Sequence, residues 1–317
     1  MTGPENDKSR LDDAARAGWL YFIAGHTQDE IAKALHVSRA SAQRLVSLCL
    51  AERLITFRLE HPIAACMELA STLKGKFNLV HCEVVPTDPA APQSTAGIAE
   101  RCANLLDATL RPEANVVVAL GTGRAIRAAV ERVTPIDRPN HQIVSLVGNI
   151  STDGSASFFD TVGRLADRTG ARHYPMPLPF LMASEDERNR MVRIGPIVRI
   201  KEIAAKADLR LVGIGQMDRN AQMHVDGFLA RDELSEMMRL GAVGEVTGWA
   251  YDARGRLLKE GTNRRLTSIA PQIPAHTATI AAALGPAKVN SICAALVGRL
   301  VNGLITDEAT ARAIIER

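Results

Sequence analysis

From about residue 79 onward, short apolar runs rich in β-branched residues alternate with longer helical segments, and this alternation limits the possible folds more than any other feature. Strands are predicted over residues 79–85, 115–120, 143–147, 209–214, 245–251, 277–283 and 300–305. Helices are predicted between them, over residues 95–110, 124–133, 159–169, 197–206, 231–240, 287–296 and 307–316. Continuous apolar strands that alternate with helices are typical of a sheet covered on both faces. The sequence therefore predicts an α/β fold with a Rossmann-like, mostly parallel sheet.

Residues 11–59 have a different pattern, in which apolar residues recur every three or four positions, as they do in helices. Pro62 ends this pattern, because a proline disfavours helical geometry in the residue before it. At roughly 150 residues per domain, the 317 residues leave room for two domains. We expect a small α-helical winged helix-turn-helix domain over residues 1–61 and an α/β domain over residues 62–317, which begins with a helix over residues 63–75.

Two short helices are predicted in the first domain, over residues 27–34 and 39–50, with a turn between them. Thr27 and Glu30 have the spacing of a capping box, and Ser38 is placed to cap the second helix. The residues expected to pack the helices together are Ile31, Ala32, Leu35, Val37, Leu45 and Leu48. This spacing is typical of a helix-turn-helix, whose second helix lies in the major groove of DNA.

The polar residues of this segment are candidate DNA contacts, because Arg and Gln form paired hydrogen bonds with guanine and adenine and Ser binds phosphate or base. Residues 38–58 contain four Arg and one Glu, and residues 54–59 resemble a β-wing. A surface arginine taken alone is more often merely solvated, but the whole pattern favours DNA binding. The candidate DNA-binding residues are Thr27, Gln28, Ser38, Arg39, Ser41, Gln43 and Arg44.

Composition excludes several classes of protein. With 46% hydrophobic and 23% charged residues the chain is not disordered, and its net charge of +3 is too small to imply a partner. An aromatic content of 4% argues against a base-stacking surface for RNA. Five scattered cysteines without a CxxC pair suit a reducing cytoplasm, and the eight histidines lack metal-binding spacing. We therefore expect a cytoplasmic protein with no signal peptide, membrane partner, metal or cofactor.

Five runs resemble, in order, segments of the SorC family of sugar-responsive bacterial transcriptional regulators. They are AGWLYFIAGHTQDEIAKALHVSRASAQRLV, VVALGTGRAIRAAV, GRLADRTGARHYPMPLPFL, LRLVGIG and VNGLITDEATARAI. The resemblance extends from about residue 14 to residue 315. It implies a winged-helix reader of double-stranded operator DNA, an effector domain similar to sugar-phosphate isomerases and deaminases, and a homotetramer.

With this resemblance, the glycine-rich turns after predicted strands become candidate binding sites for a sugar, polyol or sugar-phosphate effector. Taken alone, a GxG turn such as residues 121–124 is better explained as a tight strand-to-helix connection, and Asp252 as a turn residue. In open α/β sheets, ligands bind beyond the carboxyl ends of the strands, where these turns are expected to meet. The candidate effector-binding residues are Gly121, Thr122, Gly123, Arg124, Gly148, Asn149, Gly215, Gln216, Asp252 and Lys288.

Two nucleotide classes are excluded, because Ile126 replaces the small third residue of a dinucleotide fingerprint and no GxxxxGK[ST] P-loop occurs. The family segment AGGxxK reads ALGPAK here. Gly285 and Lys288 match it, whereas Leu284 and Pro286 depart from it. An unphosphorylated sugar or polyol therefore stays open beside a sugar phosphate. Residues 175–180 are expected to be a rigid, proline-rich extended loop that either walls the pocket or crosses the sheet.

The function expected from these features is a DNA-binding transcriptional regulator of carbohydrate metabolism whose operator affinity is gated by its effector, and not an enzyme. One alternative is a sugar-phosphate isomerase or deaminase-like enzyme, although no paired carboxylates or His–carboxylate constellation can be assigned at short spacing. Another is a constitutive DNA-binding protein whose large domain serves only assembly.

Overall fold

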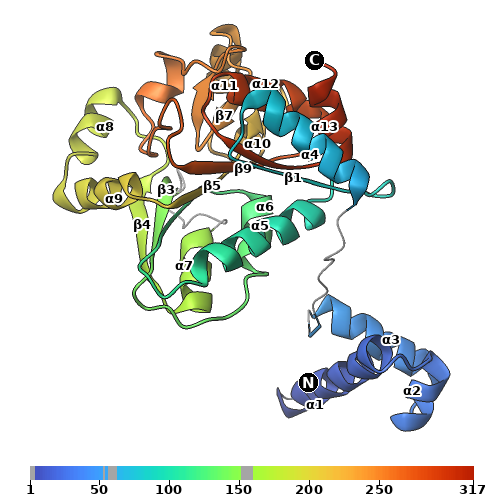
Figure 1. The fold of residues 1–317 in the computed structure, drawn as a ribbon. Coiled ribbons are helices and arrows are strands. Elements are labelled where there is room, and N and C mark those ends of the chain that lie inside the picture. The colour runs from blue at the N-terminus through green and yellow to red at the C-terminus, as the bar shows by residue number, and fades with distance from the viewer. Residues whose placement is uncertain (1–3, 53, 56–62, 151–159) are drawn as a thin grey trace. The chain divides into compact units, whose positions relative to one another are not determined.

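The computed structural model describes residues 4–52, 54–55, 63–150 and 160–317. Contacts divide the chain into two compact units, Met1–Pro62 and Ile63–Arg317, and many of their elements are labelled in Figure 1. Each unit is considered by itself. Within the described residues, no helix combines the length and apolar character that crossing a membrane requires.

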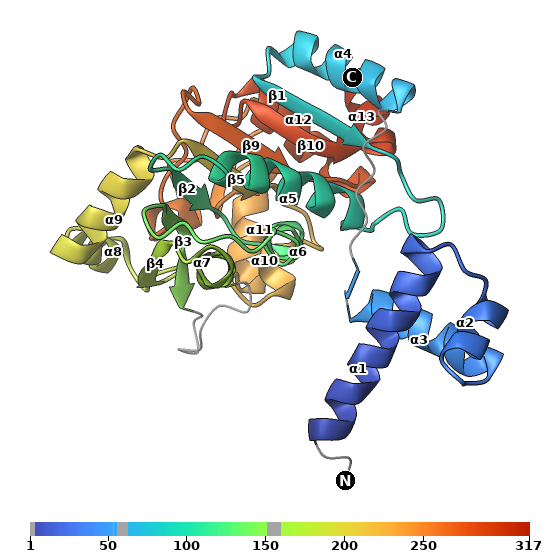
Figure 2. The same cartoon turned by 60° about the horizontal axis from the view of Figure 1, so that its bottom comes forward.

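The first unit is helical. It consists of α1 (Pro4–Gly18), a π-helical turn η1 (Trp19–Ile23), α2 (Gln28–Ala34) and α3 (Arg39–Ala51). Helices α1 and α2 both pack against α3 (Figure 2). The predicted helices over residues 27–34 and 39–50 are confirmed. The expected wing over residues 54–59 lies mostly outside the described residues.

The core of this unit centres on Ala17, Ile31, Ala42 and Val46, all of them buried. Ala32, Leu35, Val37 and Leu45 pack around it as predicted, with Leu20 and Phe22. Leu48 is only half-buried and lies outside this cluster. Small residues are needed where α1 meets α3, since a Cβ atom at Gly18 would collide with the sulfur of Cys49.

The second unit is built on a seven-stranded sheet in which every neighbouring pair is parallel. This confirms the predicted mostly parallel α/β fold. In spatial order, the strands are β1 (His81–Val85), β10 (Gly303–Asp307), β9 (Ala278–Ala282), β5 (Leu209–Gly213), β2 (Val117–Leu120), β3 (Gln142–Ile150) and β4 (Arg172–Pro179).

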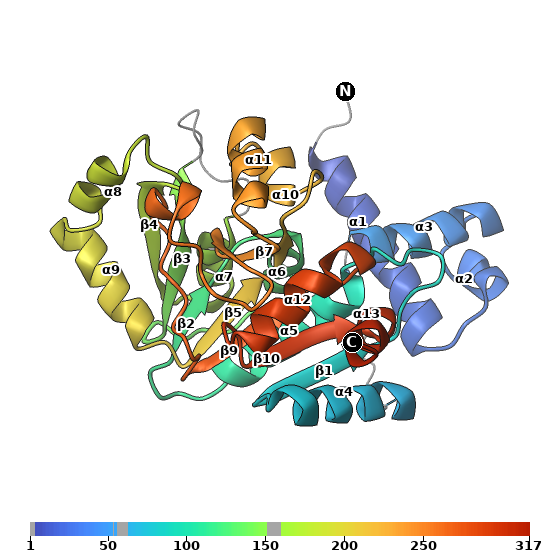
Figure 3. The same cartoon turned by 90° about the horizontal axis from the view of Figure 1, so that it is seen from above.

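Helices cover both faces of the sheet (Figure 3). One face carries α5 (Ala96–Leu110), α6 (Arg124–Val130) and α7 (Thr161–Thr169), and the other carries α4 (Ala64–Phe77), α9 (Gly195–Ala205), α12 (Val289–Val297) and α13 (Glu308–Ile315). In β2, Val118 and Leu120 belong to the cluster under α5, α6 and α7, whereas Ala119 belongs to the opposite cluster. Because both faces are buried, the central strands read as unbroken apolar runs.

The remaining elements follow the carboxyl ends of the strands or connect them. They are α8 (Glu185–Met191), β6 (Gly215–Gln216), α10 (Gln222–Val225), α11 (Arg231–Arg239), β7 (Gly244–Val246), β8 (Trp249–Tyr251) and the 3-10 turns η2 (Gly261–Arg264) and η3 (Pro286–Lys288). Strands β6, β7 and β8 form a small antiparallel sheet.

The prediction of one strand over residues 245–251 is wrong, because this segment is the hairpin of β7 and β8. Its two-residue loop consists of Thr247 with φ 51° and Gly248 with φ 88°. Positive φ at both loop positions is the geometry that tight hairpins favour, because its twist matches that of the strands. The Thr–Gly pair was the signal for this turn.

The prediction of a loop over residues 175–180 is also wrong for most of the segment, because Arg172–Pro179 forms β4 at one edge of the sheet. Pro175, Pro177 and Pro179 alternate along this strand, so their nitrogen atoms share one side. An edge strand tolerates prolines when that side has no ladder partner.

Candidate functional site

The helix-turn-helix is held by side-chain caps at both helix starts. The Thr27 hydroxyl accepts a hydrogen bond from the Glu30 amide at 3.4 Å, and the Glu30 carboxylate accepts one from the Thr27 amide at 2.7 Å. Ser38 Oγ accepts from the Ser41 amide at 3.1 Å. These bonds confirm the capping box and the cap predicted from sequence, and the backbone bond from Thr27 contributes to a lowered pKa of Glu30.

Three of the candidate DNA contacts at the start of α3 are linked to one another by hydrogen bonds. Ser38 Oγ lies 2.9 Å from Ser41 Oγ, and the Arg44 guanidinium donates to Ser41 Oγ at 3.2 Å, so these three side chains are linked along one line. Arg39, the first residue of α3, is exposed, and its guanidinium is 3.5 Å from the carboxylate of Asp29 in α2.

The other candidates of this unit are Gln43, Gln28 and Thr27. Gln43 is exposed on α3, and Gln28 is half-buried at the start of α2. The hydroxyl of Thr27 also donates to Glu30 at 2.9 Å, so this side chain acts within its own helix cap.

A pocket of about 280 Å³ opens beyond the carboxyl ends of β2, β5 and β9, three neighbouring strands. After β2 the chain continues outward to β3 and β4, and then returns to β5 on the other side of β2. This is a topological switch point, where the connections leave the sheet in opposite directions and open a crevice. The place of the pocket therefore follows from the strand order.

Five of the predicted effector residues line this pocket: Thr122, Gly123, Arg124, Gly215 and Lys288. Three others, Gly121, Gly148 and Asn149, line a smaller hollow of about 90 Å³ that shares Thr122 and Phe228 with the pocket. Glycine is required at position 123, where φ is 123°. Gly121 lies close to β5, since a Cβ there would be 3.3 Å from the Cα of Val212.

Two predicted residues line neither cavity. Gln216 lies in β6, where its amide donates to the Asn220 carbonyl at 3.4 Å. Asp252 accepts from the Arg254 amide at 2.9 Å and from the Arg256 guanidinium at 2.8 Å. It therefore stabilises the turn after β8, which is the alternative role that its sequence context suggested.

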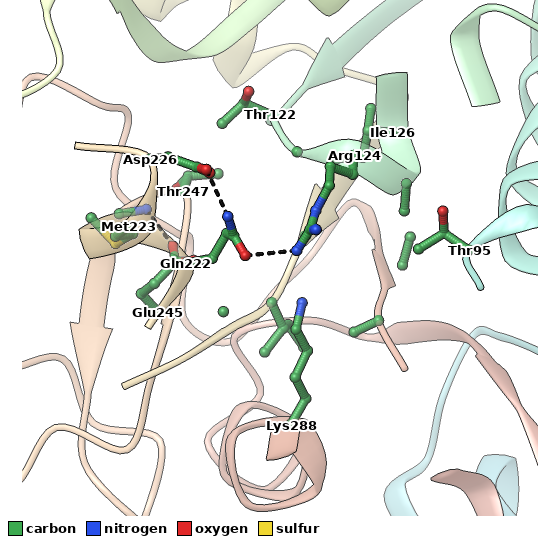
Figure 4. Close-up of a pocket in the computed structure, with 18 of the residues that line it drawn as sticks. Thr95, Thr122, Arg124, Ile126, Gln222, Met223, Asp226, Glu245, Thr247 and Lys288 are labelled. Atoms are coloured by element: carbon green, nitrogen blue, oxygen red, sulfur yellow. Dashed lines mark hydrogen bonds between the residues drawn. The ribbon is translucent and has the colours of Figure 1, made fainter. Parts of the chain in front are cut away.

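The rim of the pocket carries a relay that sequence reasoning missed (Figure 4). The Arg124 guanidinium donates to Gln222 Oε1 at 2.6 Å, and Gln222 Nε2 donates to the Asp226 carboxylate at 2.6 Å. A guanidinium only donates and a carboxylate only accepts, so the partners fix the orientation of the amide between them. Gln222 and Asp226 lie 98 or more residues beyond Arg124, at and just after the short helix α10, and no local pattern connects them with it.

The interior of the pocket holds a second pair of opposite charges, Glu245 and Lys288. Burial raises the pKa of Glu245, against the hydrogen bond from the Gly248 amide at 2.7 Å and the attraction of Lys288. Burial lowers the pKa of Lys288, and the attraction of Glu245 opposes this shift. Glu245 was missed, although a lone acidic residue within a predicted strand was a signal.

Hydroxyl groups complete the polar lining, and Phe180, Met223 and Phe228 add apolar surface. Thr95, Thr122 and Thr247 line the pocket. The lining thus offers cationic donors, carboxyl acceptors and hydroxyl groups around a space of small-molecule size. Such a lining can form hydrogen bonds with a polyhydroxyl ligand.

Metal and thiol chemistry find no support in the described part of the chain. No cluster of three or more His, Cys, Asp or Glu side chains there could hold a metal ion. All five cysteines are free, and burial raises the pKa of each, to about 12 for Cys82.

A capped helix-turn-helix and an α/β unit with a polar pocket at its switch point define a ligand-responsive transcription regulator. Residues 61–316 match the family described as "Putative sugar-binding domain". The chain is 30% identical over 302 residues to the erythritol catabolism regulatory protein EryD of Brucella abortus (strain 2308), covering 95% of this chain and 96% of that protein. It thus belongs to the SorC family of sugar-binding transcriptional regulators, which confirms the resemblance seen in its motifs.

Two further comparisons agree. The chain is 26% identical to the deoxyribonucleoside regulator of Bacillus subtilis (strain 168), covering 98% of this chain and 99% of that protein. The fold matches the full-length sorbitol operon regulator SorC from Klebsiella pneumoniae with a TM-score of 0.71 and 24% identity, over 95% of this chain and 97% of that chain.

Proposed function

We propose that the protein reads operator DNA with α3 and that a sugar, polyol or sugar phosphate in the pocket beyond β2, β5 and β9 changes its operator affinity. The observation that carries this proposal is the pocket, where Arg124, Glu245 and Lys288 from distant segments surround one space. The names of the relatives, which refer to erythritol catabolism and deoxyribonucleosides, support a carbohydrate-type effector.

Recognition of DNA falls to the exposed side chains of α3. Arg39, Gln43 and Arg44 are exposed and have the chemistry to contact base edges, while Ser38 and Ser41 are placed to hold phosphate. Readers paired by two-fold symmetry would require half-sites about 10 base pairs apart or a multiple of this. We further propose a homotetramer that acts in the cytoplasm, as the family resemblance implies.

Gating follows from linkage. A ligand that binds one arrangement of the assembly more tightly increases the population of that arrangement. Coupling free energies of this kind are typically about 1–3 kcal/mol, which corresponds to about 5- to 150-fold in operator affinity.

The test is a thermal-shift screen of sugars, polyols and their phosphates on the full-length protein, followed by operator-binding titrations with each compound that binds. We expect at least one compound to raise the melting temperature and to change operator affinity at least about fivefold. A pocket ligand that leaves operator affinity unchanged would contradict gating and favour a constitutive DNA-binding protein.

We also propose that the protein is not an enzyme, in keeping with relatives that are named as regulators. The raised pKa values of the cysteine thiols argue against a thiolate nucleophile. Turnover of a candidate sugar phosphate by the purified protein would favour the isomerase-like alternative.

A further inference from the structure

The charges that line the pocket are balanced. Its described lining contains four ionisable residues, the cations Arg124 and Lys288 and the acids Asp226 and Glu245. A phosphate monoester carries about −1.5 to −2 charges at neutral pH and offers three strong acceptor oxygens. Such a ligand needs cations that are not already matched by acids of the same site.

At the rim, the Gln222 amide connects the positive charge of Arg124 with the negative charge of Asp226. Two short hydrogen bonds, both 2.6 Å, connect the Arg124 guanidinium through this amide to the carboxylate of Asp226. The guanidinium has further N–H donors for an anion, but an anion bound there would lie near the negative charge of Asp226. In the interior, an anion bound by Lys288 would likewise lie near the carboxyl group of Glu245.

The backbone of the turn after β9 also offers few donors to an anion. The Gly285 amide donates to Thr310 Oγ1 at 2.8 Å, and the Lys288 amide donates to the Gly285 carbonyl at 3.0 Å. Pro286 has no N–H group at all. Of the four residues 285–288, only Ala287 has an amide without a backbone or side-chain acceptor among these bonds.

Hydroxyl groups, in contrast, fit this lining well. Each hydroxyl both donates and accepts, so it can donate to Glu245 or Asp226 and accept from Lys288 or Thr122 without any excess of charge. Acidic side chains among the ligand-facing groups are useful for a polyol and costly for a phosphate.

We infer that the effector is a neutral polyhydroxyl compound, a polyol or unphosphorylated sugar, and that the Arg124–Gln222–Asp226 relay disfavours its phosphate esters. This inference rests on the proposed function, because it specifies the ligand class of the same pocket.

The first test is titration calorimetry of the full-length protein with erythritol, ribitol and glucitol, each compared with its monophosphate. We expect one of the free polyols to bind and its phosphate ester to bind at least about tenfold more weakly, a difference of about 1.4 kcal/mol. An ester that binds more tightly than its free polyol would overturn the inference and leave the proposed function intact. If none of these compounds and no compound of the broader thermal-shift screen binds or changes operator affinity, the proposed function fails and this inference fails with it.

The second test removes the negative charge that balances Arg124. In Asp226→Asn the relay keeps its shape but loses its negative charge, so the ester should gain up to about fivefold in affinity relative to the polyol, the upper range for an exposed ion pair. Asp232→Asn is the matched control, since Asp232 is exposed on α11 and does not line the pocket. Equal ester-to-polyol ratios in both variants would show that the relay does not set the preference.

Discussion

The pair Glu245 and Lys288 gives a prediction whose size follows from the structure. Replacing Lys288 by Met removes the cation that attracts the buried carboxyl group of Glu245. The Gly248 amide still donates to this carboxyl group at 2.7 Å, so only the attraction of Lys288 is lost. We expect a loss of about 1 kcal/mol, close to the ~1.36 kcal/mol that corresponds to one unit of pKa. The measured quantity is the free energy of unfolding at neutral pH.

The loss in Lys288→Met should depend on pH. Burial already raises the pKa of Glu245 above its ordinary value of 4.5, and removal of Lys288 raises it further. A carboxyl group with a raised pKa in the folded state costs no stability below its unfolded pKa and lowers stability as pH rises through its folded pKa. The stability loss should therefore be small near about pH 5 and largest near about pH 8.

Urea unfolding of the full-length protein, followed by tryptophan fluorescence at both pH values, measures this effect. The double variant Lys288→Met with Glu245→Gln should recover most of the lost stability, because its amide still accepts from Gly248 and no charge is left unpaired. An equal loss of unfolding free energy at both pH values would refute this reasoning. So would a double variant whose loss equals the sum of the losses in Lys288→Met and Glu245→Gln.

Three further predictions concern the DNA-reading unit and the backbone. The double variant Arg39→Ala, Arg44→Ala should lose operator binding in a mobility-shift assay, and Arg44→Lys should weaken binding by about 1–3 kcal/mol. Intact binding by the double alanine variant would refute the assignment of α3 as the DNA-binding helix. Ser38→Ala should cost about 1 kcal/mol in thermal unfolding by removing the α3 cap, whereas Ser38→Asn should retain it, and equal melting temperatures would contradict the role of the cap. Gly255→Ala should lower the melting temperature more than Gly241→Ala, because both positions have positive φ but only the Cβ at 255 would meet the backbone of α12, at 2.2 Å.

Local signals in the sequence were sufficient for the helix-turn-helix and most of the sheet. The capping box at Thr27 needs only residues three positions apart, and the buried strands needed only unbroken apolar runs. The turn of β7 and β8 was missed because its Thr–Gly pair is a weaker turn signal than Asn–Gly or Asp–Gly.

The pocket was predicted only in part, for a physical reason. Turns at the carboxyl ends of parallel strands must meet at one edge of the sheet, so Thr122, Arg124 and Lys288 could be placed together from the strand pattern. Gln222 and Asp226 belong to a short connection after β6 whose path depends on tertiary packing. No periodicity marks such residues as ligand-facing.

The alternating prolines of β4 have a consequence for self-association. A sheet margin with free amides is a template on which another chain can add a strand, and this is a common route to aggregation. Pro175, Pro177 and Pro179 have no N–H group on this side, so of the outward-facing residues of β4 only His173 can donate a backbone hydrogen bond to an incoming strand. The alternating prolines therefore make this edge of the sheet a poor template for strand addition by a second copy of the chain.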